Sequence, residues 1–120
     1  MFCSCTGMGI LGINAYKVAV EVDLSDSFPG FDIVGLPDTA VKESRDRVHT
    51  AIFNSGFMFP VGKIVVNLAP SDIKKAGSLY DLPILIGILR ADCQIEADCE
   101  GCAFIGELSL EGTIKPVAGI

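Results

Sequence analysis

The sequence contains no tryptophan, a single histidine and no apolar run long enough to cross a membrane. Its longest apolar run, residues 82–89, is interrupted by Pro83 and Gly87, whereas a membrane-spanning helix needs about 18 consecutive apolar residues. The first eleven residues carry no basic side chain, so they do not resemble a secretory signal. We therefore expect no membrane contact and a cytoplasmic location.

Basic residues are also scarce. Nine lysines and arginines stand against fifteen acidic residues, which gives a formal net charge of −6. Nucleic-acid-binding modules usually display a basic surface, so this balance argues against strong DNA binding by the chain alone but leaves room for a local basic stripe. The sequence lacks GxxxxGK[ST] and so cannot bind ATP as a P-loop does. Residues 7–12 match GxGxxG, but no helix follows, which indicates a bend rather than a dinucleotide site.

The remaining composition, with half of the residues hydrophobic and a fifth charged, is typical of a globular domain, and we treat residues 1–120 as one domain. Residues 16–24 alternate between apolar and polar, which predicts a half-buried strand. A turn at 25–30 predicts that residues 31–36 form its antiparallel partner. Further strands are expected at residues 1–14, 63–68 and 102–110, with a hairpin partner beginning at residue 113. The sequence stops on apolar residues at its C-terminus, which leads us to expect a fragment of a longer polypeptide.

The first helix is expected from Pro37, with Asp38 or Thr39 as its cap, to about residue 55. Gly56 suits the left-handed position that follows a helix. The predicted outward face is charged and consists of Lys42, Glu43, Arg45, Asp46 and Arg47. The predicted inward face consists of Val41, Ser44, Val48, Ala51, Ile52 and Ser55.

A second helix, from Asp81 to about residue 92, is apolar on every side, and such a helix must be buried. We expect Asp81 to cap it. The preceding loop carries Lys74, Lys75, Gly77 and Ser78 at the helix N-terminus, where backbone N–H groups favour anions. This loop is a candidate contact for a phosphate of DNA or nucleotide, and a loop that simply faces water is the alternative.

Six motifs carry a resemblance to a known family. They are VDLS (22–25), PGFDIVGLPDTAVKESRDRV (29–48), NSGF (54–57), VNLAPSDIKKAGS (66–78), YDLPI (80–84) and GELSLEG (106–112). In this order they resemble the N-terminal domain of the magnesium-chelatase-like ComM/YifB family, over nearly the whole chain. The resemblance implies an α+β fold of the Lon-protease type, a two-layer βα sandwich with one mixed sheet and two main helices.

The same resemblance implies that an AAA+ ATPase domain follows beyond residue 120. Members of the family look like hexameric ATP-driven motors, and the ComM branch is associated with DNA branch migration and natural transformation. ATP and magnesium are therefore expected cofactors of the full-length protein, with none in residues 1–120. Its own AAA+ domain, the other subunits of a hexamer and DNA are the expected partners.

Lon-type proteases use a serine before the central helix and a lysine after a Gly-Glu-x-x-Leu-x-Gly hairpin. Aligned on the motifs above, Leu79 takes the place of the nucleophile and Ser78 lies one residue early. A shift of one residue turns a side chain by roughly 100° at a helix start. The lysine position falls at residue 121, and Lys115 lies too early in the hairpin. A Lon-type serine peptidase with a displaced Ser78 is therefore only an alternative reading.

The five cysteines offer a third hypothesis. Cys3 and Cys5 form CxC, Cys99 and Cys102 form CxxC, and Cys93 lies between the two motifs. Four thiolates from these motifs could hold a tetrahedral zinc ion and make the chain a zinc-stapled interaction module. Thiols without a metal are the alternative. The single histidine, His49, has no second ligand at a suitable spacing, which indicates a partly exposed helix residue.

The leading hypothesis is a non-catalytic domain of an AAA+ ATPase that supports ring assembly and DNA handling. Catalysis by residues 1–120 themselves is not expected, and ATP hydrolysis is expected from the domain that follows.

Overall fold

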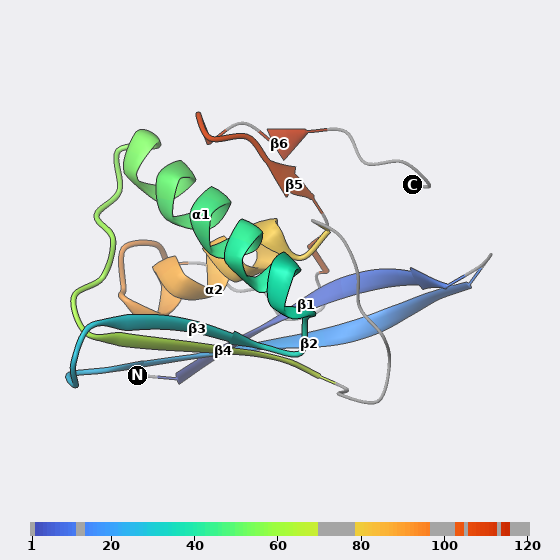
Figure 1. The fold of residues 1–120 in the computed structure, drawn as a ribbon, viewed down its shortest axis with the longest axis horizontal. Coiled ribbons are helices and arrows are strands. Elements are labelled where there is room, and N and C mark those ends of the chain that lie inside the picture. Colours follow the sequence, from blue (N-terminus) through green and yellow to red (C-terminus); the bar gives the residue numbers. More distant parts are fainter. Residues whose placement is uncertain are drawn as a thin grey trace.

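Two helices cover one face of a four-stranded sheet in the computed structural model, which describes residues 2–11, 14–69, 79–96, 103–104, 106–112 and 114–115 (Figure 1). The elements are β1 (Phe2–Leu11), β2 (Asn14–Ser25), β3 (Gly30–Val34), α1 (Asp38–Asn54), β4 (Lys63–Ala69), α2 (Asp81–Ala91), β5 (Glu107–Leu108) and β6 (Ile114–Lys115). The predicted α+β class, with one mixed sheet and two main helices, is confirmed. Among the described residues, no helix is both long and apolar enough to cross a membrane.

The sheet has the order β1-β2-β4-β3, and its pairings are mixed. β1 pairs with β2 and β2 with β4 in antiparallel fashion, whereas β3 and β4 are parallel. The prediction that residues 31–36 pair with residues 16–24 is therefore wrong, because β4 lies between those two strands. The connection from β3 to β4 runs through α1, and a helical crossover of this kind joins parallel neighbours.

The core lies between the sheet and the helices. Val20 and Val22 on β2 face the core and are fully buried, as are Val66 and Leu68, their partners in the β4 register. α2 contributes Ile84, Ile88 and Leu89, which are also buried. The alternation read from residues 16–24 is thus confirmed at the centre of the sheet, and α2 is the buried helix that its apolar sequence predicts.

The two ends of α1 differ in how well they match the sequence. Pro37 occupies the position before the helix, and neither Asp38 nor Thr39 provides the side-chain cap that was predicted. The Pro37 carbonyl instead accepts the backbone N–H of Val41 at 2.9 Å. At the other end, Gly56 has φ +86°, as the left-handed position predicts. The buried residues of α1 are Ser44, Val48, Ala51 and Ile52; Val41 is partly buried and Ser55 is exposed.

The predicted C-terminal strand forms a ladder at Glu107–Leu108, with β6 as its antiparallel partner. Among the described residues of the segment 102–110, these two alone form a ladder. Phe104 makes an isolated parallel bridge to Gly7, and its N–H donates to the Thr6 carbonyl at 2.8 Å. This bridge brings the C-terminal segment to the outer edge of β1.

Both edges of the sheet receive an arginine from a helix. Arg45 of α1 donates through Nη1 to the Phe31 carbonyl of β3 at 3.1 Å. Arg90 of α2 donates through Nη1 to the Ser4 carbonyl of β1, also at 3.1 Å. Exposed strand edges are templates for association, and these contacts occupy part of each edge.

Candidate functional site

The start of α2 carries a buried carboxylate. Asp81 is the first residue of the helix and is 1% exposed. Sequence reasoning expected it to cap α2, but Tyr80 holds that position without a side-chain cap bond. The cap assignment is therefore wrong, and Asp81 points toward α1 instead.

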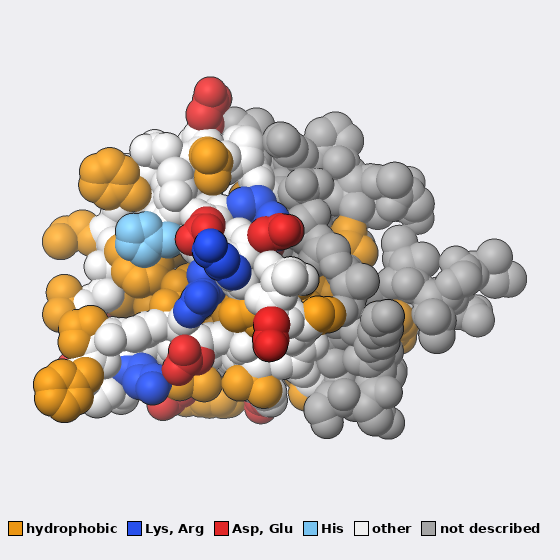
Figure 2. Space-filling view, in the orientation of Figure 1, with side chains coloured by type: hydrophobic (Ala, Val, Ile, Leu, Met, Phe, Trp, Pro, Cys, Tyr) orange, Lys and Arg blue, Asp and Glu red, His pale blue; other side chains and the backbone are white. Residues whose placement is uncertain are grey.

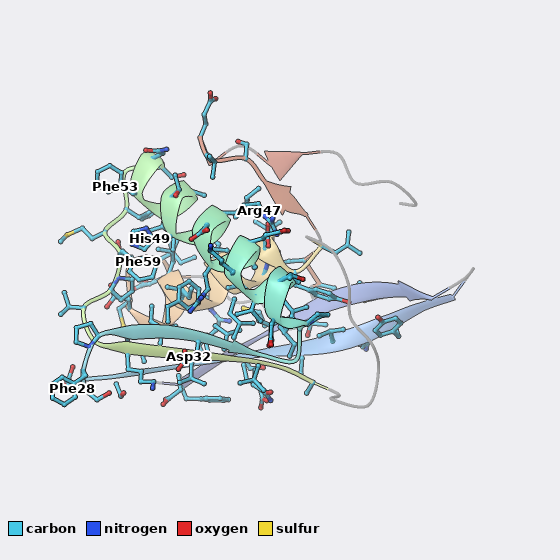
Figure 3. All side chains as sticks on the ribbon, in the orientation of Figure 1. Phe28, Asp32, Arg47, His49, Phe53 and Phe59 are labelled. Carbon is cyan, nitrogen blue, oxygen red and sulfur yellow. The ribbon has the colours of Figure 1, made fainter. Side chains whose placement is uncertain are left out.

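Three side-chain donor atoms on α1 meet this carboxylate. Ser44 Oγ donates to Oδ1 of Asp81 at 2.9 Å. Arg47 donates through Nε to Oδ2 at 2.5 Å and through Nη2 to Oδ1 at 3.3 Å. This bidentate guanidinium–carboxylate contact fixes both the distance and the orientation of the two side chains. Asp81, Ser44 and Arg47 therefore form a polar node between α1 and α2 (Figure 3 labels Arg47).

The hairpin that contains β5 also reaches the node, because the backbone N–H of Leu108 donates to the Asp81 carboxylate. Burial raises the pKa of Asp81 above its ordinary value, while the hydrogen bonds from Arg47, Ser44 and Leu108 act in the opposite direction by stabilising the charged form. With donors from α1 and β5 directed at it, the carboxylate, which belongs to α2, joins these three elements. We assign it a structural role rather than that of a general base.

Tyr80 attaches the same helix end to the sheet. It is 1% exposed, and its hydroxyl lies 3.4 Å from the hydroxyl of Tyr16 on β2. Burial, followed by the hydrogen bond with Tyr16, raises the pKa of the Tyr80 phenol. Tyr80 therefore stays neutral at physiological pH.

Leu79, which the family resemblance aligns with the Lon nucleophile, lies in a turn just before α2. Its carbonyl accepts the N–H of Gly106 at 3.2 Å, and the Gly106 carbonyl accepts the N–H of Leu82 at 3.3 Å. These paired backbone bonds dock the hairpin against the helix start. A leucine cannot act as a nucleophile, so the described part of this scaffold contains no catalytic group at that position.

The predicted anion site cannot be placed. Lys74, Lys75, Gly77 and Ser78 lie outside the described residues, as do Cys99 and Cys102 of the predicted zinc site. Binding of an anion by this loop remains a prediction. Catalysis by Ser78 also remains an untested alternative.

Two cysteines of the zinc hypothesis are described. Cys5 is 3% exposed and belongs to the core, while Cys3 is partly buried and packs against it. The Sγ of Cys5 lies 3.4 Å from Nη1 of Arg90. Cys93 is exposed, just beyond the C-terminal end of α2. Within the part of the chain that the structure describes, no three metal-ligating side chains gather in a way that could hold an ion.

His49 is exposed on α1, and its ring packs against the ring of Phe59 in a tilted arrangement, with 4.2 Å between the ring centroids (Figure 3). Phe59 in turn meets Phe31 at 5.6 Å. The expectation of a helix residue open to solvent is thus confirmed. The aromatic contact was not foreseen, because nothing in the sequence places the loop after α1 beside His49.

The node itself escaped sequence reasoning because Arg47 was assigned to the outward face of α1. Its side chain is only 22% exposed, and it also meets Glu43 at 3.8 Å on the solvent side. A signal did exist, since Ser44 was predicted on the inward face. A hydroxyl among apolar core residues requires a partner, and Asp81 was the acidic residue at the start of the buried helix.

The family model of subunit ChlI of Mg-chelatase matches residues 20–120. The chain is 49% identical over 110 residues to YifB, an uncharacterized protein of Salmonella typhimurium, and 46% identical over 111 residues to the competence protein ComM of Haemophilus influenzae. These matches cover 91% and 92% of this chain but only 22% of each relative. An uncharacterized protein of Mycobacterium tuberculosis is 36% identical over 114 residues, 94% of this chain and 23% of that protein. The chain thus spans about a fifth of the length of these relatives.

Proposed function

Because this chain belongs to the ChlI family of Mg-chelatase subunits and to its ComM/YifB branch, we propose that it serves as a non-catalytic N-terminal domain of a cytoplasmic AAA+ ATPase. In this proposal the remaining four-fifths of a polypeptide of the relatives' length binds ATP and magnesium and assembles into a hexamer. Residues 1–120 form one tier of the ring and help to guide DNA. The printed name of the Haemophilus relative, a competence protein, supports a role in DNA handling.

The observation that carries the non-catalytic assignment is the polar node together with Leu79. The buried carboxylate at the start of α2 receives hydrogen bonds from Ser44, Arg47 and the Leu108 N–H. The family resemblance aligns Leu79 with the Lon-type nucleophile. A helix start held by these hydrogen bonds favours the view that this domain supplies a rigid surface. In this proposal ATP hydrolysis belongs to another part of the polypeptide.

DNA contact is assigned to the loop with Lys74, Lys75, Gly77 and Ser78, on the N-terminal side of α2. The first test measures the anisotropy of a fluorescein-labelled oligonucleotide with a polypeptide of the relatives' length. Replacing both Lys74 and Lys75 by alanine should weaken binding and flatten its salt dependence, because each phosphate contact releases counterions. Lys17→Ala together with Lys42→Ala, two exposed lysines on β2 and α1, is the matched control. If the two double variants lost DNA affinity equally, the loop would not be the DNA contact.

Ring formation is tested separately. Sedimentation with a non-hydrolysable ATP analogue should show a hexamer for the polypeptide of the relatives' length and a weaker or absent hexamer when residues 1–120 are removed. ATP hydrolysis per active site should persist without residues 1–120, because the proposal gives that reaction to the rest of the polypeptide. If removal abolished hydrolysis while the ring stayed intact, the non-catalytic assignment would be wrong.

The peptidase alternative has its own test. A fluorophosphonate probe reacts with activated serines, and labelling that disappears in Ser78→Ala would establish catalysis at Ser78. We expect no such labelling, because a nucleophilic serine needs an adjacent base within hydrogen-bond reach. A Lon-type lysine would have to come from beyond residue 115.

A further inference from the structure

One end of the molecule exposes four large apolar side chains. They are Phe28, Phe53, Met58 and Val61, which are 91%, 72%, 75% and 85% exposed. We call them the apolar end. Figure 2 shows hydrophobic side chains gathered along the left edge of this face, and Figure 3 places Phe28 and Phe53 there.

Phe53 belongs to α1, and the loops that carry the other three side chains of the apolar end are held by hydrogen bonds. The side-chain amide of Gln94 receives the N–H of Met58 on Oε1 at 2.9 Å and donates through Nε2 to the Met58 carbonyl at 2.5 Å. The Gly62 carbonyl accepts the N–H of Gly30 at 3.3 Å. Gly62 has φ +116°, and a Cβ there would lie 2.3 Å from the Ser25 carbonyl oxygen, so only glycine fits. These contacts preorganise the apolar side chains, which lowers the entropy cost of binding a partner.

An acidic hollow adjoins the apolar end. It has a volume of about 470 Å³ and is lined by three acidic residues, Asp23, Asp26 and Asp92, together with Leu24, Ser25, Ala91 and Cys93. Asp26 also lines a second hollow together with Phe28. Gln94 links the hollow to the loop of Met58, because its side-chain amide donates both to Asp92 Oδ2 at 2.8 Å and to the Met58 carbonyl. The apolar residues and the acidic hollow therefore form one continuous surface.

We propose that this surface docks a basic amphipathic segment of a partner protein, with apolar side chains on the apolar end and lysine or arginine in the acidic hollow. Charge complementarity selects this occupant. DNA phosphates would meet the three aspartates with like charge. A second copy of this chain, at a net charge of −6, would bring further negative charge to the same site. Exposed apolar patches bordered by polar groups are typical of protein interaction sites.

The proposal is tested with a fluorescein-labelled peptide of about 18 residues, or roughly five helical turns, with leucines on one face and lysines on the other. The purified chain should raise its anisotropy at low salt. Asp23→Asn together with Asp26→Asn should weaken binding at least about tenfold and reduce its salt dependence, because the pairs formed are electrostatic. Phe28→Ser together with Met58→Ser should weaken binding to a similar extent, because the apolar anchors are lost.

Matched controls change the same chemistry elsewhere. Asp38→Asn with Glu111→Gln removes the same charge from two other exposed sites, and Val34→Ser with Leu110→Ser removes exposed apolar groups. Both controls should bind within about twofold of the wild type, since surface changes away from a contact are nearly neutral. The proposal fails if the peptide does not bind, if the controls lose as much as the test variants, or if a peptide with glutamates in place of lysines binds equally well. It also fails if Phe28→Ser with Met58→Ser converts a self-associated chain into a monomer, which would assign this surface to a second copy.

This test needs neither ATP nor DNA. Its failure would therefore leave the proposed ring function untouched, and failure of the ring function would leave this surface to be judged on its own.

Discussion

Ser44 and Asp81 lie 37 residues apart in the sequence, yet the hydroxyl of one donates to the carboxylate of the other at 2.9 Å, between α1 and α2. Both side chains are 1% exposed. The contact places two polar groups inside an otherwise apolar core, and Arg47 supplies the charge that makes this burial tolerable. Helix–helix packing in this domain therefore depends on hydrogen-bond geometry as well as on apolar area.

The first prediction concerns this node. Asp81→Ala should lower the free energy of unfolding by about 3 kcal/mol, because it leaves Arg47 and Ser44 without their acceptor. Urea unfolding measured at neutral pH by circular dichroism gives this value. Glu43→Ala is the matched control, since it removes the exposed partner of Arg47, 3.8 Å away, and should cost less than about 1 kcal/mol. Similar losses in both variants would show that the node is no stronger than a surface ion pair.

The second prediction concerns pH. The pKa of Tyr80 is raised in the folded state, whereas a tyrosine in the unfolded chain titrates near pH 10. The contribution of Tyr80 to the free energy of unfolding is therefore fully present below about pH 10. It is lost as the pH rises above that value, because only the unfolded chain then releases the phenol proton. Stability between pH 9 and pH 11, roughly one unit on each side of that pKa, should fall less steeply in Tyr80→Phe than in the wild type.

The phenol itself can be observed directly. The sequence has two tyrosines and no tryptophan, so Tyr16→Phe leaves Tyr80 as the only source of tyrosinate absorbance in the ultraviolet. In that variant the absorbance should appear together with unfolding and not before it. A titration near pH 10 with the fold still intact would contradict the burial of Tyr80.

The third prediction concerns zinc. Native mass spectrometry should detect no bound zinc, because Cys5 lies in the core beside α2, where its sulfur would be 4.0 Å from a Cβ placed on Gly87. A tetrahedral thiolate site that includes Cys5 would need that sulfur to leave the core. One bound zinc ion that is lost in Cys99→Ser would instead establish the metal site.

Sequence reasoning succeeded where a local pattern determines the outcome. The alternation of β2 and the all-apolar composition of α2 each predict burial, and Val20, Val22, Ile84 and Ile88 are buried. The family followed from motifs that extend over most of the chain, and the match of residues 20–120 to the family model confirms it. In each case the information lies within a few neighbouring residues or in a long string of identities.

Sequence reasoning failed where contacts between segments far apart in the chain determine the structure. The short turn before β3 suggests a hairpin, but the crossover through α1 inserts β4 beside β2. The charge of Arg47 suggested solvent, but its guanidinium reaches the carboxylate of Asp81 on another helix. The apolar end was also missed, because Phe28, Met58 and Val61 are apolar residues that composition alone would assign to the core.

The last prediction tests how closely α2 packs on the sheet. Gly87 lies in the middle of α2, where an added Cβ would stand 2.7 Å from Cγ2 of Val22 on β2. Gly87→Ala should therefore lower the free energy of unfolding by about 1–3 kcal/mol, the usual cost of overpacking, even though alanine is the better helix former. Gly30→Ala is the matched control, because its Cβ would meet nothing closer than Lys63 Cγ at 4.0 Å. It should change stability by less than about 0.5 kcal/mol. If Gly87→Ala stabilised the chain instead, helix propensity would outweigh packing and α2 would have room to move away from β2.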